Sequence, residues 1–139
     1  MVVPRLIRQA LGGEALTVYG DGNQQRCFCN LRDVVRALLG LAEHPDAVGQ
    51  VFNIGSNHEI SIKGLAEKII KLTKSKSSIS YTPYNEAYAP GFEDMMRRVP
   101  DTQKVHDLLG WEAAIPLDET LASIRDEIAS SLKRPVSPS

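Results

Sequence analysis

The chain has 139 residues, of which 42% are hydrophobic and 24% charged, and these values are ordinary for a globular protein. Sixteen Lys and Arg residues against seventeen Asp and Glu residues give a net charge of −1, so the basic excess of a nucleic-acid-binding protein is absent. Two cysteines are too few for a disulfide scaffold, and we expect neither a signal peptide nor the roughly 20-residue apolar run of a membrane span. These features predict a cytoplasmic globular protein.

The first segments are predicted to alternate helix and strand. A helical pattern with apolar residues on one side begins near Pro4, and a pair of glycines suits its end. Leu16–Tyr19 alternates apolar and polar residues, which predicts a strand with two different faces. The glycine turn Gly20–Asn23 then leads into a second predicted strand, Gln25–Cys29.

A second helix and a buried strand are predicted to follow. Asn30 suits the N-cap of this helix, with Asp33 in place of the Glu or Gln of a capping box. The helix is expected to bury a stripe of apolar residues, namely Val34, Leu38 and Leu41. Gln50–Ile54 is a near-continuous apolar run, which is typical of a strand buried on both faces in a parallel sheet.

The second half repeats this alternation. Ser61 is expected to cap a helix, Ser78–Tyr81 to form a strand, and Asp101 to cap a short helix. A last helix is marked by apolar residues, namely Leu121, Ile124 and Ile128. The chain is therefore predicted to be an α/β protein, and we expect its Pro- and Ser-rich tail, residues 133–139, to be disordered.

The stretch from Leu16 to Phe28 is the most informative about function. A glycine turn between two strands leaves backbone amides open to a ligand, and Arg26 follows the turn. A guanidinium fork in that place suits a diphosphate, because it can donate two parallel charge-assisted hydrogen bonds. The alternative is a hairpin with a solvated arginine, since glycine turns are common.

Several other residues have two interpretations each. Arg97 and Arg98 form either a solvated pair or a second anion-binding group. Asn53, at the end of a predicted strand, either reaches a ligand or caps the following loop. Three aromatic residues form either a satellite core, which is the favoured interpretation, or a base-stacking platform, and they are Tyr84, Tyr88 and Phe92.

The two cysteines, Cys27 and Cys29, fall on one face of a predicted strand. Residues at this spacing in one strand rarely meet disulfide geometry, and the three histidines are scattered along the chain. The cysteines are therefore interpreted as two small buried thiols, and no metal site is predicted.

Five motifs in chain order carry a resemblance to a known family: PRLIRQAL, LTVYGDGNQQRCF, DVVRAL, VFNIG and RRVPDTQKVHDLLGW. Their order and spacing resemble the C-terminal part of extended short-chain dehydrogenases/reductases. The similar branch contains UDP-sugar 4-epimerases, dTDP-glucose 4,6-dehydratases and UDP-glucuronate decarboxylases. The resemblance implies that residues 1–132 are the nucleotide-sugar-binding part of such an enzyme, together with the last helix and strand of its Rossmann-like sheet.

The resemblance also implies a substrate-binding site. Arg26 stands at the family's diphosphate-binding arginine, and either Arg97 or Arg98 lies near a second one. Asn53 matches an Asn that approaches the diphosphate in some members. The base is expected to lie along the main chain and side chains of a further group of residues, namely Val2, Val3, Thr17, Val18 and Tyr19.

The family's catalytic and cofactor-binding motifs do not occur in this sequence. No Gly-x-Gly-x-x-Gly opens a helix, and there is no Tyr-x-x-x-Lys. The resemblance implies that the full-length enzyme binds NAD(P) and that this chain, predicted to be inactive alone, does not. We expect it to bind a UDP- or dTDP-sugar, to form a homo-oligomer, and to bind neither nucleic acid nor membranes. The alternative is a non-catalytic binding or oligomerisation module that retains the family's C-terminal fold.

Overall fold

The computed structural model describes residues 1–84 and 95–133 and has a mixed α/β fold, as predicted. Tyr88, Phe92 and residues 134–139 lie outside the described residues. None of the described helices is long and apolar enough to cross a membrane. In chain order the elements are α1 (Val2–Gly12), β1 (Leu16–Tyr19), β2 (Gln25–Cys27), α2 (Leu31–Glu43), the 3-10 helix η1 (Pro45–Ala47), β3 (Glu59–Ser61), α3 (Ile62–Thr73), β4 (Ile79–Thr82), β5 (Arg97–Arg98), α5 (Gln103–Leu109) and α6 (Leu117–Lys133).

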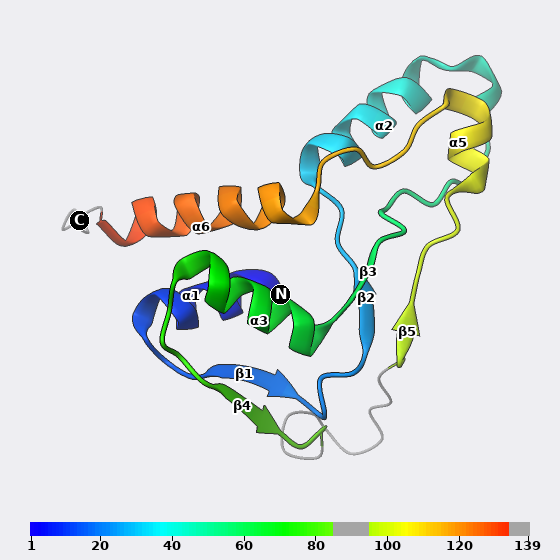
Figure 1. Cartoon of the computed structure of the whole chain (residues 1–139). Helices are drawn as coiled ribbons and strands as arrows, with labels where there is room; N and C mark the ends of the chain where they lie inside the picture. Colours follow the sequence, from blue (N-terminus) through cyan, green and yellow to red (C-terminus); the bar gives the residue numbers. More distant parts are fainter. Residues whose placement is uncertain (85–94, 134–139) are drawn as a thin grey trace, which may run out of the picture.

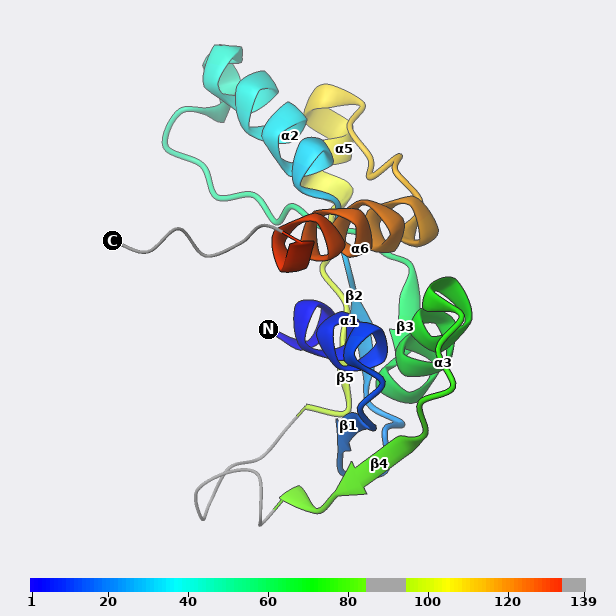
Figure 2. The same ribbon diagram turned by 90° about the vertical axis from the view of Figure 1, so that its left-hand side faces the viewer.

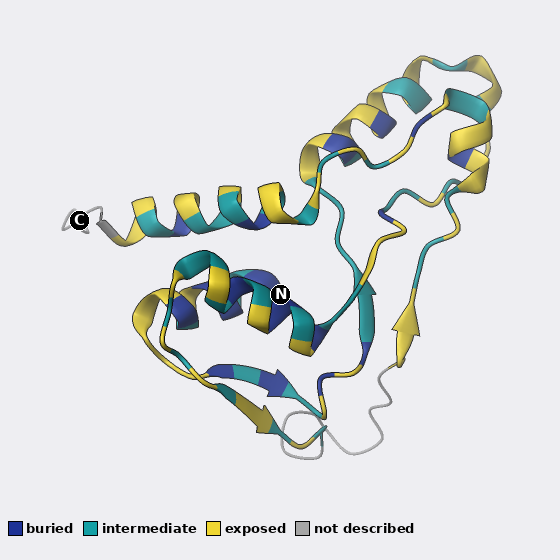
Figure 3. Ribbon diagram, in the orientation of Figure 1, coloured by how far each residue is buried: buried dark blue, intermediate teal, exposed yellow. Residues whose placement is uncertain are grey.

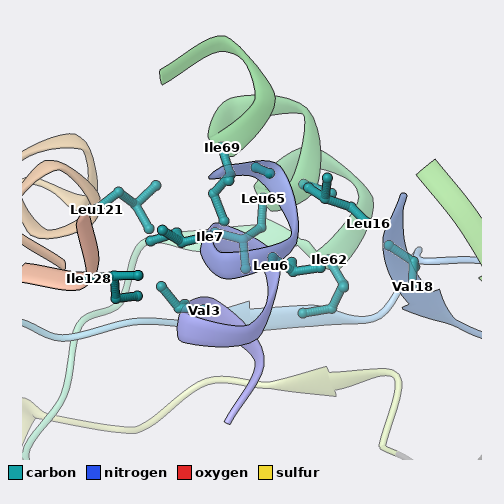
Figure 4. Close-up of a cluster of buried hydrophobic side chains, with 12 residues drawn as sticks. Val3, Leu6, Ile7, Leu16, Val18, Ile62, Leu65, Ile69, Leu121 and Ile128 are labelled. Carbon is teal, nitrogen blue, oxygen red and sulfur yellow. The ribbon is translucent and has the colours of Figure 1, made fainter. Parts of the chain in front are cut away.

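The main core lies between three helices and a parallel pair of strands. Strands β1 and β4 pair in parallel, α1 and α3 cover them, and α6 packs along α1 (Figures 1 and 2). The inward side chains of these helices are fully buried, among them Leu6, Leu65 and Leu121 (Figure 4). Apolar burial of this kind stabilises a domain by roughly 25 cal/mol per Å² of surface removed from water. The core therefore fixes β1, with its Leu16 and Val18 face inward as predicted.

A second, smaller unit is built from α2 and α5. Its core contains Ala37, Val105 and Trp111, and it lies at the other end of the molecule from β1 and β4 (Figures 2 and 3). The two ends are joined by a sheet in the order β3-β2-β5, in which β2 pairs antiparallel with β3 and parallel with β5. The predicted glycine turn is therefore not a hairpin, because β1 and β2 belong to different sheets.

Local capping explains why the helices begin and end where they do. The Asn30 side chain accepts a hydrogen bond from the backbone N–H of Arg32 at 2.9 Å, and Ser61 Oγ accepts one from Gly64 N–H at 3.0 Å. At the end of α1, Gly13 has a φ of 73°, a left-handed conformation that suits glycine. The caps predicted at Asn30 and Ser61 are thus confirmed.

The prediction of a buried strand at Gln50–Ile54 is wrong. Residues 51–58 have no regular structure, and Val51 is 83% exposed. A strand needs a neighbour to satisfy its backbone hydrogen bonds, and no described strand pairs with this segment. The helix α2 that precedes it is present as predicted, so only half of the expected helix–strand unit forms.

The predicted inner face of α2 is only partly correct. Leu38 is 54% exposed, and the buried residues of α2 are Asp33 and Ala37. Leu41 packs against the core of Ala37, Val105 and Trp111, whereas Leu38 lies toward solvent. Strand β2 also ends at Cys27, two residues earlier than predicted.

Candidate functional site

A cavity of about 600 Å³ lies where the start of α1, the glycine turn and the middle sheet meet. Side chains from different elements line it, including Val2, Arg5, Tyr19, Gln24, Arg26 and Arg98. The core described above fixes α1 and β1, so one wall of the cavity is rigid. The cavity therefore brings together apolar and aromatic side chains and three arginines.

The glycine turn positions the two sides of this cavity. Gly20 and Gly22 have φ values of 67° and 75°, which favour glycine. The ring of Tyr84 packs directly against Gly20, where a β-carbon would overlap it. Asp21 accepts hydrogen bonds from the backbone and side-chain amides of Asn23, each at 2.9 Å, and these bonds lower the pKa of Asp21. The turn thus carries the chain from Tyr19 on one wall to Arg26 on another.

Arg26 and Arg98 are direct neighbours across two paired strands. Arg26 on β2 is the register partner of Arg98 on β5, and both line the cavity. Nη1 of Arg26 donates to the carbonyl oxygens of Gln25 and Met95, each at 2.7 Å. Like charges side by side on neighbouring strands repel, so an anion between the two guanidinium groups would stabilise the pair.

Arg97 has a different role from Arg98. Its Nε and Nη2 donate to the two carboxylate oxygens of Glu59, each at 2.8 Å. The hydrogen bond from Arg97 also lowers the pKa of Glu59. Successive residues of a strand point to opposite faces, so only Arg98 shares the face of Arg26. Of the two arginines that the sequence left open, Arg98 lines the cavity and Arg97 does not.

The predicted residues on β1 and α1 fall into two groups. Val2 and Tyr19 line the cavity, whereas Val3 and Val18 are buried in the main core behind it. Thr17 belongs to neither group, and its side-chain oxygen accepts a hydrogen bond from Gln9 Nε2 at 2.9 Å.

Asn53 is not brought to the site. It is exposed in the segment that was predicted to be a strand, and it does not line the cavity. An Asn at the carboxyl end of a sheet strand would face ligands bound there, but that strand is absent here.

Among the residues of the cavity wall that were not predicted from the sequence, two carry guanidinium or amide groups, namely Arg5 and Gln24. The guanidinium of Arg5 lies over the Tyr19 ring, 4.4 Å from its centroid, and Gln24 is only 4% exposed. The spacing of both residues from predicted site residues indicates that they lie on the same side of the chain as the site. Arg5 is three residues after Val2 on one helix face, and Gln24 is two residues before Arg26.

Cys27 and Cys29 lie beside a second cavity of about 300 Å³, which also touches Arg26 and Arg98. Both thiols are free and half-buried, where full burial was expected. Burial raises the pKa of both, so they are uncharged near neutral pH.

Comparison with known proteins identifies the family. Residues 1–55 match the model of the NAD dependent epimerase/dehydratase family. Over 131 residues the chain is 40% identical to UDP-N-acetyl-alpha-D-glucosaminuronate decarboxylase of Bacillus cytotoxicus. This match covers 90% of the present chain and 40% of that relative. The chain is similar to the NAD-dependent epimerase/dehydratase family. The resemblance predicted from the five motifs is thereby confirmed.

Solved epimerases of this family share the fold of the chain. UDP-glucose 4-epimerase from Thermotoga maritima, in a structure with UDP-glucose, superposes with a TM-score of 0.82 and 28% identity, over 96% of this chain and 40% of that one. UDP-glucuronic acid 4-epimerase from Bacillus cereus, in complex with UDP-glucuronic acid and NAD, superposes with a TM-score of 0.83 and 26% identity, over 94% of this chain and 40% of that one. The chain thus spans about 40% of the length of these relatives.

Proposed function

We propose that the cavity of about 600 Å³ binds the nucleoside-diphosphate part of a UDP- or dTDP-sugar. The observation that carries this proposal is the pairing of Arg26 with Arg98 at one wall of the cavity. Two guanidinium groups side by side match the two phosphates of a diphosphate better than a single phosphate. Family relatives solved with UDP-glucose and with UDP-glucuronic acid support the same ligand class.

The base and ribose belong at the other wall in this proposal. Val2, Tyr19 and Tyr84 provide apolar and aromatic surface there, beside the glycine turn. Aromatic rings with a polar edge suit a nucleobase, which needs both stacking and hydrogen bonds. Val3 and Val18 act from behind this wall by holding α1 and β1 in place.

Turnover requires groups that we place outside this chain. The sequence contains neither the Gly-x-Gly-x-x-Gly loop nor the Tyr-x-x-x-Lys pair, and the described cavity walls offer no substitute for the loop. NAD is therefore assigned to the remainder of a longer protein. The 139-residue chain is proposed to hold substrate without epimerising, dehydrating or decarboxylating it.

Calorimetric titration of UDP into wild type, Arg26→Ala and Arg26→Lys tests the proposal. Hydrogen bonds to a charged group contribute about 1.5–3 kcal/mol, so Arg26→Ala should lower the affinity for UDP by roughly ten- to a hundredfold. Arg26→Lys should retain only part of the wild-type affinity for UDP, because an ammonium keeps the charge but cannot donate the two parallel hydrogen bonds of a guanidinium. Thermal melts of all three proteins provide the control for folding. Equal UDP affinity in wild type and a folded Arg26→Ala variant would show that the diphosphate does not bind there.

A further inference from the structure

Cys27 and Cys29 line one cavity, the cavity of about 300 Å³ described above, and neither is disulfide-bonded. Phe28, which stands between them, packs against the main core, whereas Cys29 packs against the core of the smaller unit. Successive side chains of a strand alternate between its two sides, so the two thiols lie on the same side of the chain. Both residues are partly exposed. The cavity therefore holds a pair of accessible thiols.

The spacing of the two thiols is too wide for a disulfide. Two residues apart along an extended chain, Cα atoms are separated by roughly 6.6 Å, and Cβ atoms on one side are about as far apart. A disulfide needs Cβ atoms about 3.5–4.5 Å apart, so the two sulfurs are not placed to bond to each other. Two metal–thiolate bonds of about 2.3 Å each would span most of this gap. The pair is therefore spaced for an ion held between two sulfurs.

The number of ligands decides which ion such a pair can hold. Among the described residues, no group of three or more His, Cys, Asp or Glu side chains could hold a metal ion. The described walls of this cavity contain no histidine and no carboxylate, so the two thiols are its metal-binding groups. Zinc takes four ligands, and calcium and magnesium take six or more, mostly oxygens. Soft thiolates select Cu(I), which two sulfurs on opposite sides of the ion can satisfy.

The charges at the cavity suit the complex that would form. Burial raises the pKa of both thiols, so an ion must displace one proton from each. Two thiolates and one Cu(I) ion then carry a net negative charge. Arg26 and Arg98 also line this cavity, and their positive charge favours an anionic complex there.

We propose that Cys27 and Cys29 bind one Cu(I) ion between their two sulfur atoms. Binding forms two copper–sulfur bonds and releases one proton from each thiol. Copper stays monovalent, so the step needs no oxidant or reductant. The Cys29 S–H donates to Asn30 O at 3.7 Å, a weak contact that is given up with the proton. This inference does not depend on the proposed nucleotide binding.

Titration of Cu(I) into the full 139-residue chain tests the proposal, without oxygen and with bicinchoninate, a coloured Cu(I) chelator, as competitor. Wild type should bind one Cu(I) ion per chain, and Zn(II) should not compete for the site. Cys27→Ser and Cys29→Ser should each weaken Cu(I) binding at least about a hundredfold, because loss of a ligand costs more than loss of a group that orients one.

The exposed methionines are competing soft donors, and they provide the matched control. Met95 and Met96 are 54% and 57% exposed and do not line the cavity, so Met95→Leu and Met96→Leu should bind Cu(I) like wild type. Thermal melts check that each variant is folded. Wild-type affinity in a folded Cys27→Ser or Cys29→Ser variant overturns the proposal, because one thiol or another group then binds the ion. A ratio of one Cu(I) per two chains also overturns it, since the ion then bridges two molecules.

Discussion

Gly20 links the glycine turn to the shape of the cavity. A β-carbon at this position would overlap the Tyr84 ring, and φ is 67°. We predict that Gly20→Ala costs about 1–3 kcal/mol of stability from backbone strain and also lowers UDP affinity, because Tyr84 must leave the cavity wall. Gly13→Ala is the matched control, since Gly13 has a φ of 73° with no neighbour within 4 Å. Thermal melts and UDP titration of both variants check this; UDP affinity unchanged in Gly20→Ala would contradict it.

At the level of single residues, the sequence predicted Arg26 but could not choose between Arg97 and Arg98. The choice depends on strand register, since a one-residue shift in β5 would exchange their faces. Arg5 and Gln24 were missed because their importance comes from hydrogen bonds across the fold, to Thr17 and Tyr19. The spacing from Val2 and from Arg26 indicates the side on which these two residues lie, but it does not show these hydrogen bonds.

Among the elements, α2 is attached to the chain after α5 largely through Asp33, whose carboxylate is buried. Asp33 is 2% exposed, and its Oδ2 accepts from the backbone N–H groups of Ala114 at 3.0 Å and Ile115 at 2.9 Å. Its backbone oxygen accepts from Trp111 Nε1 at 3.1 Å. Burial alone would raise the pKa of Asp33, but the hydrogen bonds from Ile115, Arg36 and Ala114 outweigh burial and lower it.

This lowered pKa predicts a loss of stability in acid. The contribution of Asp33 is fully present above the ordinary carboxylate pKa of 3.8, and it is lost as the pH falls below that value through the lower folded-state pKa. Fluorescence of Trp111, the only tryptophan, should report the loosening of α2 below about pH 4. Asp33→Asn should cost about 1–3 kcal/mol at neutral pH and flatten the acid transition. The same acid transition in wild type and Asp33→Asn would assign it to another group.

The elements that were predicted correctly are those whose partners lie within the chain. Helices α1 and α3 bury their apolar faces on each other and on β1, so their periodicity was sufficient. The run at Gln50–Ile54 is also largely apolar, but no described strand pairs with it. Hydrophobicity predicts that a segment tends to be buried, not which surface covers it.

For the whole molecule, the exposed apolar face of α2 and the segment after it predicts self-association. Leu38 is 54% exposed, Leu39 60% and Val51 83%. Exposed large apolar side chains promote association when they lie close enough to form a patch. We expect sedimentation to show a dimer or larger assembly of the 139-residue chain, which Leu39→Lys weakens. Leu132→Lys, at a 66% exposed position on α6, is the matched control and should associate like wild type. A monomeric wild type at high concentration would contradict the prediction.

The central claim is that a diphosphate binds between Arg26 and Arg98. Its most direct test compares Arg98 with Arg97, the residue before it in the sequence. Titration of UDP into wild type, Arg98→Ala and Arg97→Ala compares a cavity residue with a neighbour that is paired to Glu59. We predict that Arg98→Ala lowers UDP affinity by roughly ten- to a hundredfold, while Arg97→Ala changes it by less than about threefold. Wild-type affinity in Arg98→Ala, with a large loss in Arg97→Ala, would contradict the account.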